Sequence, residues 1–498
     1  MTSLAKPSLI TPSLMRRVFQ QFLLSIAVFC FSSLGGWAAE VEPLRQASDS
    51  AQQLRRDMQD RPNFLVIAID DLNDYVGSLG GHPNASTPNL DRLAKTGVLF
   101  TNAHCVSPVC NPSRTAIWTG LRPTTTGIHS NPSGWFREKP GFENVVTLSQ
   151  AMLTNGYSTY GYGKLYHQVR SSSSEWLRSN AYFYGPLQSP KVNYPAGITF
   201  TDWGVPPNGD TASHDAEIAQ RTIDTLLDSH DRPVFVGCGF YRPHTPMYAK
   251  QEWFDRHPLS GVQLPEGAIE NDTDDLVYFG KRDRRPQDVE APGLWTHDWV
   301  GANGRWKEIV QAYLASTSAM DHQLGRVMDA LQKSALRENT YIICFSDHGY
   351  HLGEKRHWGK ATLWELATRV PFIIVGPGIP AGFVCDKPVE LLNIYPTVMD
   401  YAGLTPPHEL EGRSLRPLLE DVNAAWNHPA WTTFVDHHSL KTERWRYIRY
   451  SSGEEELYDT KHDPRELSNL AFGEPEAPQI AEVLGMLRGQ LDVLLERN

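Results

Sequence analysis

Four short runs of hydrophobic residues are continuous rather than alternating, which is typical of strands buried on both faces of a parallel sheet. They cover residues 63–70, 234–238, 341–345 and 370–375. Apolar positions in residues 306–336 instead recur every three to four residues, which predicts one long amphipathic helix. Shorter helices are expected from Thr87 to Ala94 and over residues 148–153. Strands alternating with helices predict an α/β fold with a large central, mostly parallel sheet covered by helices.

Two of the predicted strands end in acidic residues. Asp70 and Asp71 close the first strand, and the pair Asp347 and His348 follows the third almost at once. In open α/β sheets the functional groups gather beyond the carboxyl ends of the strands. We therefore expect these two pairs, far apart in the sequence, to lie at one edge of the sheet.

Long polar stretches and a change of composition suggest how the chain is divided. Residues 168–232 and 265–304 are rich in Ser, Pro, Asp and Gly, and predict long surface loops over the edge that carries the acids. The last region has short strand patterns and a closing helix, over residues 431–435, 447–450 and 478–495. We therefore predict a catalytic domain over residues 61–424 and a small α+β subdomain over residues 425–498.

The N-terminus has the pattern of an export signal. Two arginines precede a mostly apolar stretch, and small residues near Ala38 and Ala39 offer a cleavage site. The apolar stretch is short and interrupted by polar residues, so a membrane anchor is the less favoured alternative and no stable membrane span is expected. We predict a signal peptide over residues 1–39, a polar lead-in over residues 40–60, and a periplasmic or secreted mature protein.

Charge and cysteine content narrow the classes of function. The 498 residues carry a formal net charge of −11, and so acidic a chain is a poor binder of nucleic acid. An anionic substrate would then need basic side chains concentrated at its site. Cys30 leaves with the predicted signal, and the remaining cysteines are Cys105, Cys110, Cys238, Cys344 and Cys385. In an exported protein this odd number leaves at least one thiol free, modified or paired between chains.

The most informative of these cysteines is Cys110. It lies on a predicted turn, with Pro112 at the start of a short helix. A helix N-terminus supplies backbone N–H groups and the positive end of a dipole, which favour a thiolate or a bound anion. A buried structural cysteine is the alternative for this segment taken alone.

The acids at the strand ends suggest a cation. The carboxylates of Asp70, Asp71 and Asp347 would repel one another unless a positive charge lay between them. Oxygen ligands favour Ca²⁺ or Mg²⁺, whereas the imidazole of His348 leaves Mn²⁺ open as well. Taken singly, each acidic pair could instead be a helix cap or a loop acid.

Basic residues accompany the same segments. They are Arg114, Lys164, His167, His244 and Lys360. Any one of them could be a solvated surface group. Together they would form the ring of donors that an anionic ester needs.

The segment Cys110–Gly120 reads Cys-x-Pro-Ser-Arg, four further residues, then Thr-Gly, and it resembles the signature of the type I sulfatases. The resemblance implies an alkaline-phosphatase-like fold. It also implies that a formylglycine-generating enzyme oxidises Cys110 to formylglycine, an aldehyde that is hydrated at rest. The thiols left are Cys105, Cys238, Cys344 and Cys385.

The resemblance also implies roles for the site residues. Ca²⁺ would be held by Asp70, Asp71, Asp347, His348 and the residue formed from Cys110. The catalytic set would be Cys110, Arg114, Lys164, His167, His244 and Lys360, of which Lys164, His244 and Lys360 bind the sulfate. Asp347 would take a proton from the formylglycine hydrate, whose oxygen attacks sulfur, while His244 or Lys360 protonates the leaving oxygen. His167 would take the remaining hydroxyl proton as sulfate leaves.

Segments 163–167, 241–246 and 346–353 look most like iduronate-2-sulfatases and their bacterial relatives. This likeness implies an exported enzyme acting on a sulfated saccharide, such as a 2-O-sulfated uronic acid or a related glycan residue. A uronate also carries a carboxylate, for which the candidate partners are Lys355, Arg356 and His357, shortly before Lys360. Solvated loop charges are the alternative for these three residues, and Arg356 is the one chosen for the test. Two alternatives stay open: a phosphate mono- or diester hydrolase of the same superfamily, and a non-catalytic, cation-dependent binder of sulfated glycans.

Overall fold

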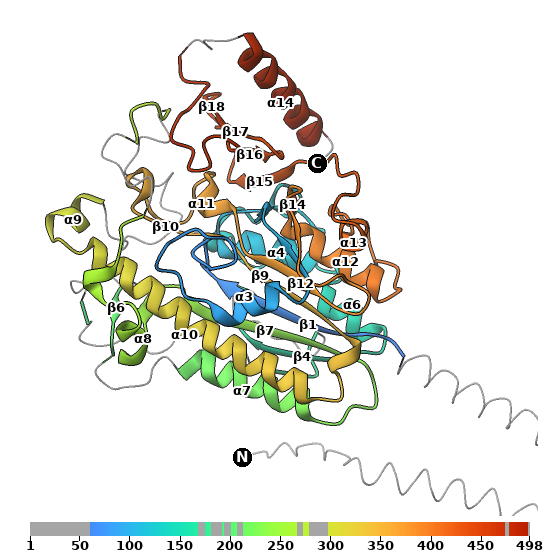
Figure 1. Ribbon diagram of the computed structural model, residues 1–498. Coiled ribbons are helices and arrows are strands. Elements are labelled where there is room, and N and C mark those ends of the chain that lie inside the picture. Colours follow the sequence, from blue (N-terminus) through green and yellow to red (C-terminus); the bar gives the residue numbers. More distant parts are fainter. Residues whose placement is uncertain are drawn as a thin grey trace, which may run out of the picture. The chain divides into compact units, whose positions relative to one another are not determined.

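The computed structural model describes residues 60–167, 175–180, 192–193, 201–206, 213–265, 272–277, 297–473 and 478–496. Residues 61–498 form one compact unit, to which the following description applies (Figure 1). The predicted signal peptide and all but the last residue of the polar lead-in lie outside the described residues. Within the described part of the chain, no helix is both long enough and apolar enough to cross a bilayer.

The main sheet has eight strands in the order β13-β2-β12-β9-β1-β7-β4-β5. These strands are β1 (Asn63–Asp70), β2 (Val98–Phe100), β4 (Ser158–Gly163), β5 (Arg178–Asn180), β7 (Val234–Pro243), β9 (Thr340–Ser346), β12 (Phe372–Val375) and β13 (Phe383–Cys385). All neighbouring pairs are parallel except the two that involve β12. The prediction of a mostly parallel sheet is therefore confirmed, and β12 runs backwards because the chain re-enters the sheet from the edge where β9 ends.

The centre of the sheet brings three distant segments together. Strand β1 is buried along its whole length and pairs with β7 on one side and β9 on the other. Ala68 faces Gly239 across one ladder and Phe345 across the other. Because all three strands run the same way, their carboxyl ends lie at one edge, as the sequence predicts.

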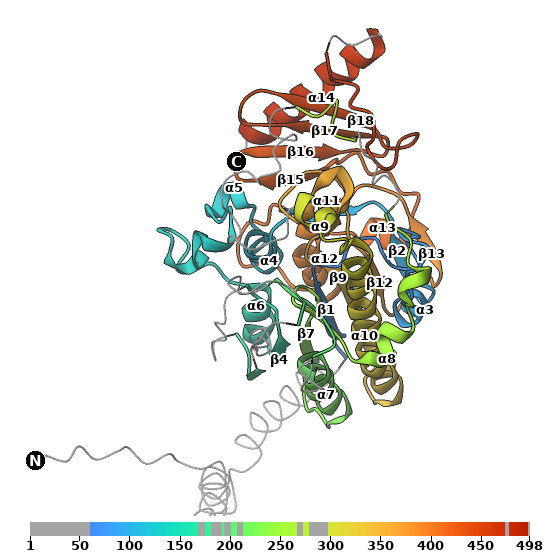
Figure 2. The same cartoon turned by 90° about the vertical axis from the view of Figure 1, so that its left-hand side faces the viewer.

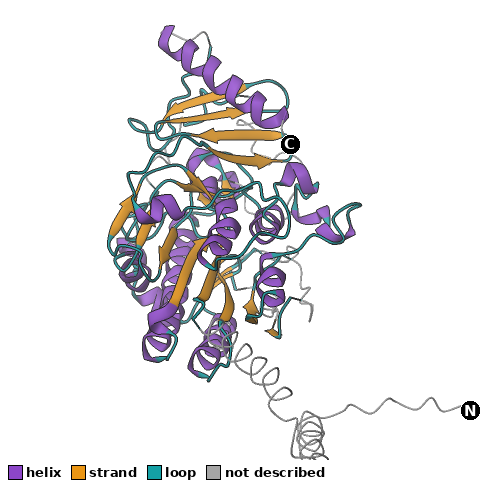
Figure 3. Cartoon of the chain, turned by 90° about the vertical axis from the view of Figure 1, so that its right-hand side faces the viewer, coloured by secondary structure: helices purple, strands orange, loops and turns teal. Residues whose placement is uncertain are grey.

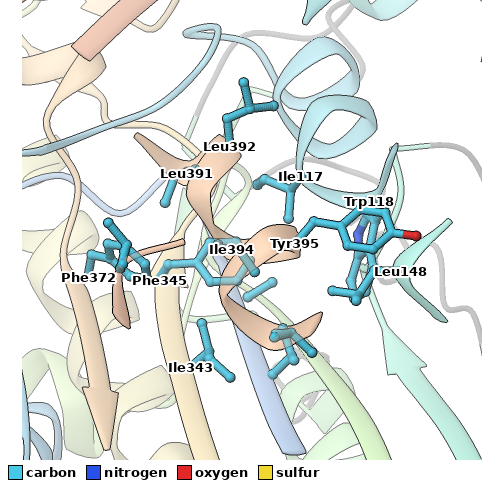
Figure 4. Close-up of a cluster of buried hydrophobic side chains, with 14 of the residues drawn as sticks. Ile117, Trp118, Leu148, Ile343, Phe345, Phe372, Leu391, Leu392, Ile394 and Tyr395 are labelled. Carbon is cyan, nitrogen blue, oxygen red and sulfur yellow. The ribbon is translucent and has the colours of Figure 1, made fainter. Parts of the chain in front are cut away.

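Side chains of β1 alternate between two hydrophobic cores, one on each face of the sheet. Leu65, Ile67 and Ile69 pack with α3 (Pro88–Ala94), α7 (Ser213–Leu227) and α10 (Trp306–Lys333). Phe64, Val66 and Ala68 pack with α4 (Cys110–Thr119), α6 (Leu148–Thr154) and α12 (Ile394–Tyr401). In Figure 2 the strands β1 and β7 lie between two layers, with α4 and α6 on one side and α10 on the opposite side. Figure 4 shows Trp118, Leu148 and Tyr395 in the second core.

Helix α7 corrects the prediction of a loop over residues 168–232. Ile218, Ala219 and Leu226 are buried against β7 and α10, at helical spacing. The polar residues around them dilute this pattern, which is why composition alone suggested a loop. In the second predicted loop, residues 297–302 form α9 (His297–Ala302), whereas residues 266–271 and 278–296 lie outside the described part of the chain.

A second sheet forms the C-terminal subdomain. It is antiparallel and consists of β15 (Ala430–Phe434), β16 (His437–Lys441), β17 (Trp445–Arg449) and β18 (Glu455–Asp459). Helix α14 (Pro478–Glu496) covers one face through Leu484, Leu487 and Leu491 (Figure 3). The α+β character of this region is confirmed, although the polar strand β16 was not predicted.

The remaining elements are short. The strands are β3 (Ala103–His104), β6 (Trp203–Gly204), β8 (Met247–Tyr248), β10 (His351–Leu352), β11 (Trp358–Gly359) and β14 (Val389–Glu390). The helices are α5 (Pro123–Thr126), α8 (Gln251–Asp255), α11 (Glu365–Thr368) and α13 (Arg416–Glu420). Strands β10 and β11 and helix α11 lie in the connection from β9 to β12, which also carries Lys360.

Candidate active site

The two acidic pairs meet just beyond the ends of β1 and β9. The Asp347 backbone N–H donates to Ile69 O at 3.0 Å, and the Asp71 N–H donates to Asp347 Oδ1 at 3.3 Å. Ser113 Oγ donates to Asp347 O at 2.6 Å, which ties this strand end to α4. All three carboxylates, those of Asp70, Asp71 and Asp347, are fully buried.

Cys110 is the first residue of α4, with its side chain fully buried among these acids. Its Sγ atom lies 3.0 Å from Lys360 Nζ, 3.3 Å from His348 Nε2 and 3.5 Å from Lys164 Nζ. The distance from Sγ to Asp70 Oδ1 is 3.7 Å. The structure therefore brings residues up to 250 positions away from Cys110 in the sequence around its sulfur atom.

This surrounding charge distinguishes Cys110 from the other cysteines. Burial raises the pKa of its thiol, but Lys164, Lys360 and His348 outweigh that effect and hold the pKa well below its ordinary value. The four other described cysteines are free thiols whose pKa burial raises: Cys105, Cys238, Cys344 and Cys385. Cys110 is therefore the one described cysteine that favours the thiolate.

Each of the three carboxylates faces a basic side chain. Lys164 Nζ forms an ion pair with Asp70, and Lys360 Nζ lies 2.6 Å from Asp71 Oδ1. Burial would raise the pKa of Asp70, but the adjacent Lys164 ammonium lowers it. For Asp71 burial dominates, and its pKa is raised.

Arg114 completes the set of pairs. Its Nε donates to Asp347 Oδ2 at 2.7 Å, and its Nη2 lies 3.6 Å from Asp70 Oδ1. Its Nη1 donates to the backbone oxygen of Lys164. The guanidinium thus joins the ends of β1, β4 and β9. Burial would lower its pKa, but Asp347 and Asp70 raise it, so the group stays charged.

Three histidines lie at or near the same centre. His348 Nε2 is 3.5 Å from Asp71 Oδ1 and 3.6 Å from Asp347 Oδ2. Burial would lower the pKa of His348, but Asp347 raises it to about 9. His244 Nε2 lies 3.8 Å from Asp71 Oδ2, and a hydrogen bond from the half-buried His167 helps lower the pKa of Cys110.

The donor atoms are compatible with a divalent cation. Ligand atoms of Asp70, Cys110, Asp347 and His348 all lie within 4.8 Å of one another, as do those of Asp70, Asp71, Cys110 and His244. Asp71 Oδ2 is buried and has no hydrogen-bond partner within the described part of the chain, an arrangement that a cation would satisfy. Carboxylate oxygens are the ligands that Ca²⁺ and Mg²⁺ prefer. The residues therefore fit a metal, and His244, expected to bind sulfate or to protonate the leaving oxygen, is also within reach as a ligand.

Arg356 has a different environment from the other candidate residues. Its side chain is 38% exposed and pairs with Asp298 at 2.5 Å. The neighbouring Lys355 is buried, lies 3.4 Å from Asp272, and donates to the backbone oxygen of Glu466. Among the described residues, no contact joins either side chain to the cluster around Cys110.

Two residues of the site were missed by the sequence analysis. Ser113 holds the backbone of Asp347, and Tyr313 Oη donates to Asp71 O at 2.7 Å. Ser113 belongs to the Cys-x-Pro-Ser-Arg segment, so a signal existed in the sequence. Tyr313 lies in the long helix α10, where its position looked like that of any core residue.

Comparisons with known proteins agree with this geometry. The sequence model of the sulfatase family matches residues 62–404, and the one described as N-sulphoglucosamine sulphohydrolase, C-terminal, matches residues 353–496. A protein of Formosa agariphila named sulfatase is 38% identical over 442 residues, which is 85% of each chain. A Δ4,5-hexuronate-2-O-sulfatase of Bacteroides thetaiotaomicron is 28% identical over 466 residues, covering 88% of this chain and 90% of its own.

Solved structures show the same fold. The phosphonate monoester hydrolase of Agrobacterium radiobacter is similar with a TM-score of 0.69 and 24% identity, over 88% of this chain and 96% of that one. The eight-stranded sheet with helices on both faces is thus the alkaline-phosphatase-like architecture, with a C-terminal subdomain added. Together with the complete Cys110–Gly120 segment at the centre of the buried charges, these matches show that the chain belongs to the type I sulfatase family and is a sulfuric ester hydrolase.

Proposed function

We propose that this enzyme acts after export and hydrolyses a sulfate ester on a saccharide, using formylglycine at position 110 and a divalent cation, Ca²⁺ in the first instance. The observation that carries the proposal is the position of Cys110 Sγ, within 3.5 Å of Lys164, His348 and Lys360 and beside Asp70. A nucleophile formed there would meet a sulfate group already neutralised by basic side chains. The sulfatase family generally uses both formylglycine and a divalent metal.

The residues that would hold the cation are Asp70, Asp71, Asp347 and His348, together with the group formed from Cys110. The cation would polarise a sulfate oxygen, and hydrated formylglycine would supply the attacking hydroxyl. Asp347 is the proton acceptor for that hydroxyl, and Arg114 Nε orients its carboxylate through a hydrogen bond of 2.7 Å. The Lys164 ammonium lowers the pKa of Asp70 and keeps that carboxylate ionised.

The basic residues around position 110 would bind the sulfate and move its protons. Lys164 pairs with Asp70 and Lys360 pairs with Asp71. Both ammonium groups also lie within 3.5 Å of Cys110 Sγ, so both can contact sulfate oxygens. Lys360 Nζ or His244 Nε2 protonates the leaving sugar oxygen. His167, which is in hydrogen-bond contact with Cys110, takes the proton that is released when sulfate leaves.

The proposed maturation is tested by peptide mass spectrometry. In a host with a formylglycine-generating enzyme, the peptide that contains Cys110 should lose the thiol mass and gain that of an aldehyde. Cys110→Ala should abolish turnover while the protein still folds. Fully active enzyme with an unmodified Cys110 would contradict the proposal.

The cation is tested by exhaustive chelation and re-addition. Activity should be lost with the metal and return with Ca²⁺, with Mg²⁺ and Mn²⁺ compared alongside, because the cation held by the buried carboxylates would polarise the sulfate. Asp70→Ala and Asp347→Ala should lose metal and activity together. An unchanged rate in the chelated enzyme would show that no metal is needed.

We further propose that the sugar is a 2-O-sulfated uronic acid or a related glycan residue. The support is the name of the Bacteroides relative and the likeness of segments 163–167, 241–246 and 346–353 to iduronate-2-sulfatases. Arg356 remains the candidate for the uronate carboxylate, and it would have to exchange its pair with Asp298 for one with substrate. A charge-assisted pair of this kind is worth roughly 1.5–3 kcal/mol, about tenfold to a hundredfold in specificity.

The test compares kcat/KM for a 2-sulfated uronide and its neutral-sugar counterpart, in wild type and in Arg356→Ala. Preference for the uronide in wild type that is lost in Arg356→Ala supports both parts of the proposal. Equal rates for the two sugars in wild type would refute uronate selectivity. Selectivity that survives the substitution would remove the role of Arg356 alone.

A phosphate mono- or diester hydrolase is the second candidate, since the fold is shared with a phosphonate monoester hydrolase. Turnover of matched aryl sulfate, phosphate and phosphonate esters separates the two, and we expect the sulfate to be preferred.

For the export step, N-terminal sequencing of the secreted protein should find a start near Ala39.

A further inference from the structure

Lys360 lies in a segment whose backbone is strained. We refer to residues 355–365 as the Lys360 segment. Within it Lys355, Arg356 and Ala361 have φ angles of 50°, 52° and 71°, in the left-handed region that side chains other than glycine avoid. This backbone conformation is unfavourable for residues that carry a Cβ, so contacts from outside must stabilise the segment.

The two ends of the Lys360 segment are held by one residue of the C-terminal subdomain. Glu466 accepts a hydrogen bond from Lys355 Nζ through its backbone oxygen. Its carboxylate Oε2 accepts another from the Glu365 backbone N–H at 2.8 Å. Glu466 therefore contacts the residue five positions before Lys360 and the residue five positions after it.

Arg446 of β17 connects Glu466 to the same segment. Its side chain has no exposed surface, and it forms ion pairs with both Glu365 and Glu466. It also donates to Leu363 O at 3.2 Å, three residues from Lys360, and to Ser439 Oγ at 2.9 Å. The planar guanidinium reaches all four of these groups at once, which a lysine ammonium in the same place could not do.

The same subdomain also holds the chain that leads to Cys110. Thr433 of β15 donates its N–H to Val106 O at 2.8 Å, and Thr432 Oγ1 donates to Cys105 O at 2.6 Å. Ala361 N–H in turn donates to Pro108 O at 3.0 Å, so the Cys110 and Lys360 segments contact each other. A small hydrophobic cluster that includes Val109, Ala361, Phe434 and Ile448 fills the space beneath them.

We infer that Arg446 is a positioning residue for Lys360: through Glu365, Glu466 and Leu363 it fixes the Lys360 segment so that Lys360 Nζ lies 3.0 Å from position 110. The inference rests on the proposed function, because it assumes that Lys360 binds sulfate or protonates the leaving oxygen. It extends that function by making the C-terminal sheet part of the machinery, although none of its side chains is proposed to touch the substrate.

The competing explanation is that Arg446 only stabilises the fold. Its surroundings also contain Lys441, His104 and Arg369, whose charges act with that of Arg446 to lower the pKa of Glu365. A purely structural role would lower the amount or stability of folded enzyme, and it would affect every active-site variant to the same extent. A positioning role would matter only while Lys360 is present.

A double-mutant cycle separates these explanations. We would measure kcat/KM of the mature, metal-loaded enzyme with 4-nitrophenyl sulfate, per folded molecule, for wild type, Arg446→Lys, Lys360→Ala and the double variant. Arg446→Lys should lower kcat/KM by about 10- to 100-fold in the wild-type background, since a displacement near 1 Å can cost that much. In the Lys360→Ala background the same change should cost less than about threefold if the two residues act as a unit.

The matched control is Arg444→Lys. Arg444 precedes β17 and pairs with Asp459, but its side chain is 49% exposed. It should leave kcat/KM unchanged in both backgrounds. Equal losses from Arg446→Lys with and without Lys360 would overturn the inference, as would no loss in either.

A second variant guards against misfolding of Arg446→Lys. Glu466→Gln keeps the size of the side chain but removes the negative charge that pairs with Arg446. Its effect on kcat/KM should depend on Lys360 in the same way. The cycle also separates the two levels of the proposal. If Lys360→Ala alone is fully active, the role of Lys360 is wrong and the inference fails with it, whereas an impaired Lys360→Ala with additive losses overturns only the role of Arg446.

Discussion

Removal of the Arg114 guanidinium is the sharpest test of how the buried negative charges of Asp70 and Asp347 are compensated. Arg114→Met keeps most of the aliphatic stem but deletes the group that pairs with Asp347 at 2.7 Å and lies 3.6 Å from Asp70. The Arg114 side chain is only 1% exposed, so water cannot replace it without rearrangement. The backbone oxygen of Lys164 loses its donor as well.

The loss of stability can be estimated in two ways. Removing one partner of a buried ion pair costs about 3–5 kcal/mol. Coulomb's law with an effective dielectric constant near 20 gives about 4 kcal/mol for two charges roughly 4 Å apart. We therefore expect the metal-free variant to lose about 4 kcal/mol of unfolding free energy. A bound divalent cation compensates the same carboxylates, so the loss should shrink in excess Ca²⁺.

The assay is guanidinium chloride unfolding of the purified protein, with chelator and with Ca²⁺. Arg92→Met is the control, because Arg92 and its partner Asp329 are 53% and 55% exposed, and it should cost less than about 1 kcal/mol. Adding Asp347→Asn to Arg114→Met should recover part of the loss by removing the unpaired charge. A loss below about 1 kcal/mol in the metal-free variant would refute the view that Arg114 compensates the acids.

The remaining predictions concern the C-terminal sheet, the loop after β9 and the core beneath the site. Burial lowers the pKa of Lys441 to about 8, so its folded form binds fewer protons than the unfolded chain between about pH 8 and 10.5. Wild-type stability should therefore rise by about 3 kcal/mol relative to Lys441→Met across that range, and parallel pH curves for the two proteins would contradict the assignment. In Gly349→Ala the new Cβ would lie 1.9 Å from Leu366 O, which should displace the neighbouring His348 and lower both metal affinity, measured by titration, and activity. Trp118→Ala should cost about 3–5 kcal/mol in denaturant unfolding, because the ring is buried and its Nε1 donates to Leu165 O at 2.7 Å, next to Lys164.

The sequence predicted the central fold well because its signals are local. Continuous apolar runs identify β1 and β9, and three-to-four spacing identifies α10, without any knowledge of the partners. The reversed direction of β12 depends on where the preceding connection emerges, which no local pattern records. Helix α7 has suitable spacing, but Ser, Asp, Gln and Thr residues conceal it.

The site was predictable to the extent that its residues belong to strand ends or to a recognisable motif. Asp70 and Asp347 follow buried strands, so sheet topology alone brings them together. Lys164 also follows a strand, β4, whereas Lys360 had no such signal beyond resemblance. Arg446 and Glu466 could not have been found, since their proposed role depends on contacts between the C-terminal subdomain and residues 355–365. Buried charge pairs of this kind become apparent only when both partners are placed.

The complete burial of Cys110 sets a time limit on its proposed conversion. Once β9 has joined β1 and Lys360 has closed over the sulfur, a modifying enzyme could no longer reach the side chain. Lys360 is synthesised 250 residues after Cys110, which at about 5–20 residues per second takes roughly 10–50 s. The length of chain between Cys110 and Lys360 would thus set the time during which Cys110 is accessible to the modifying enzyme. Faster synthesis or folding should increase the fraction of enzyme that retains its thiol.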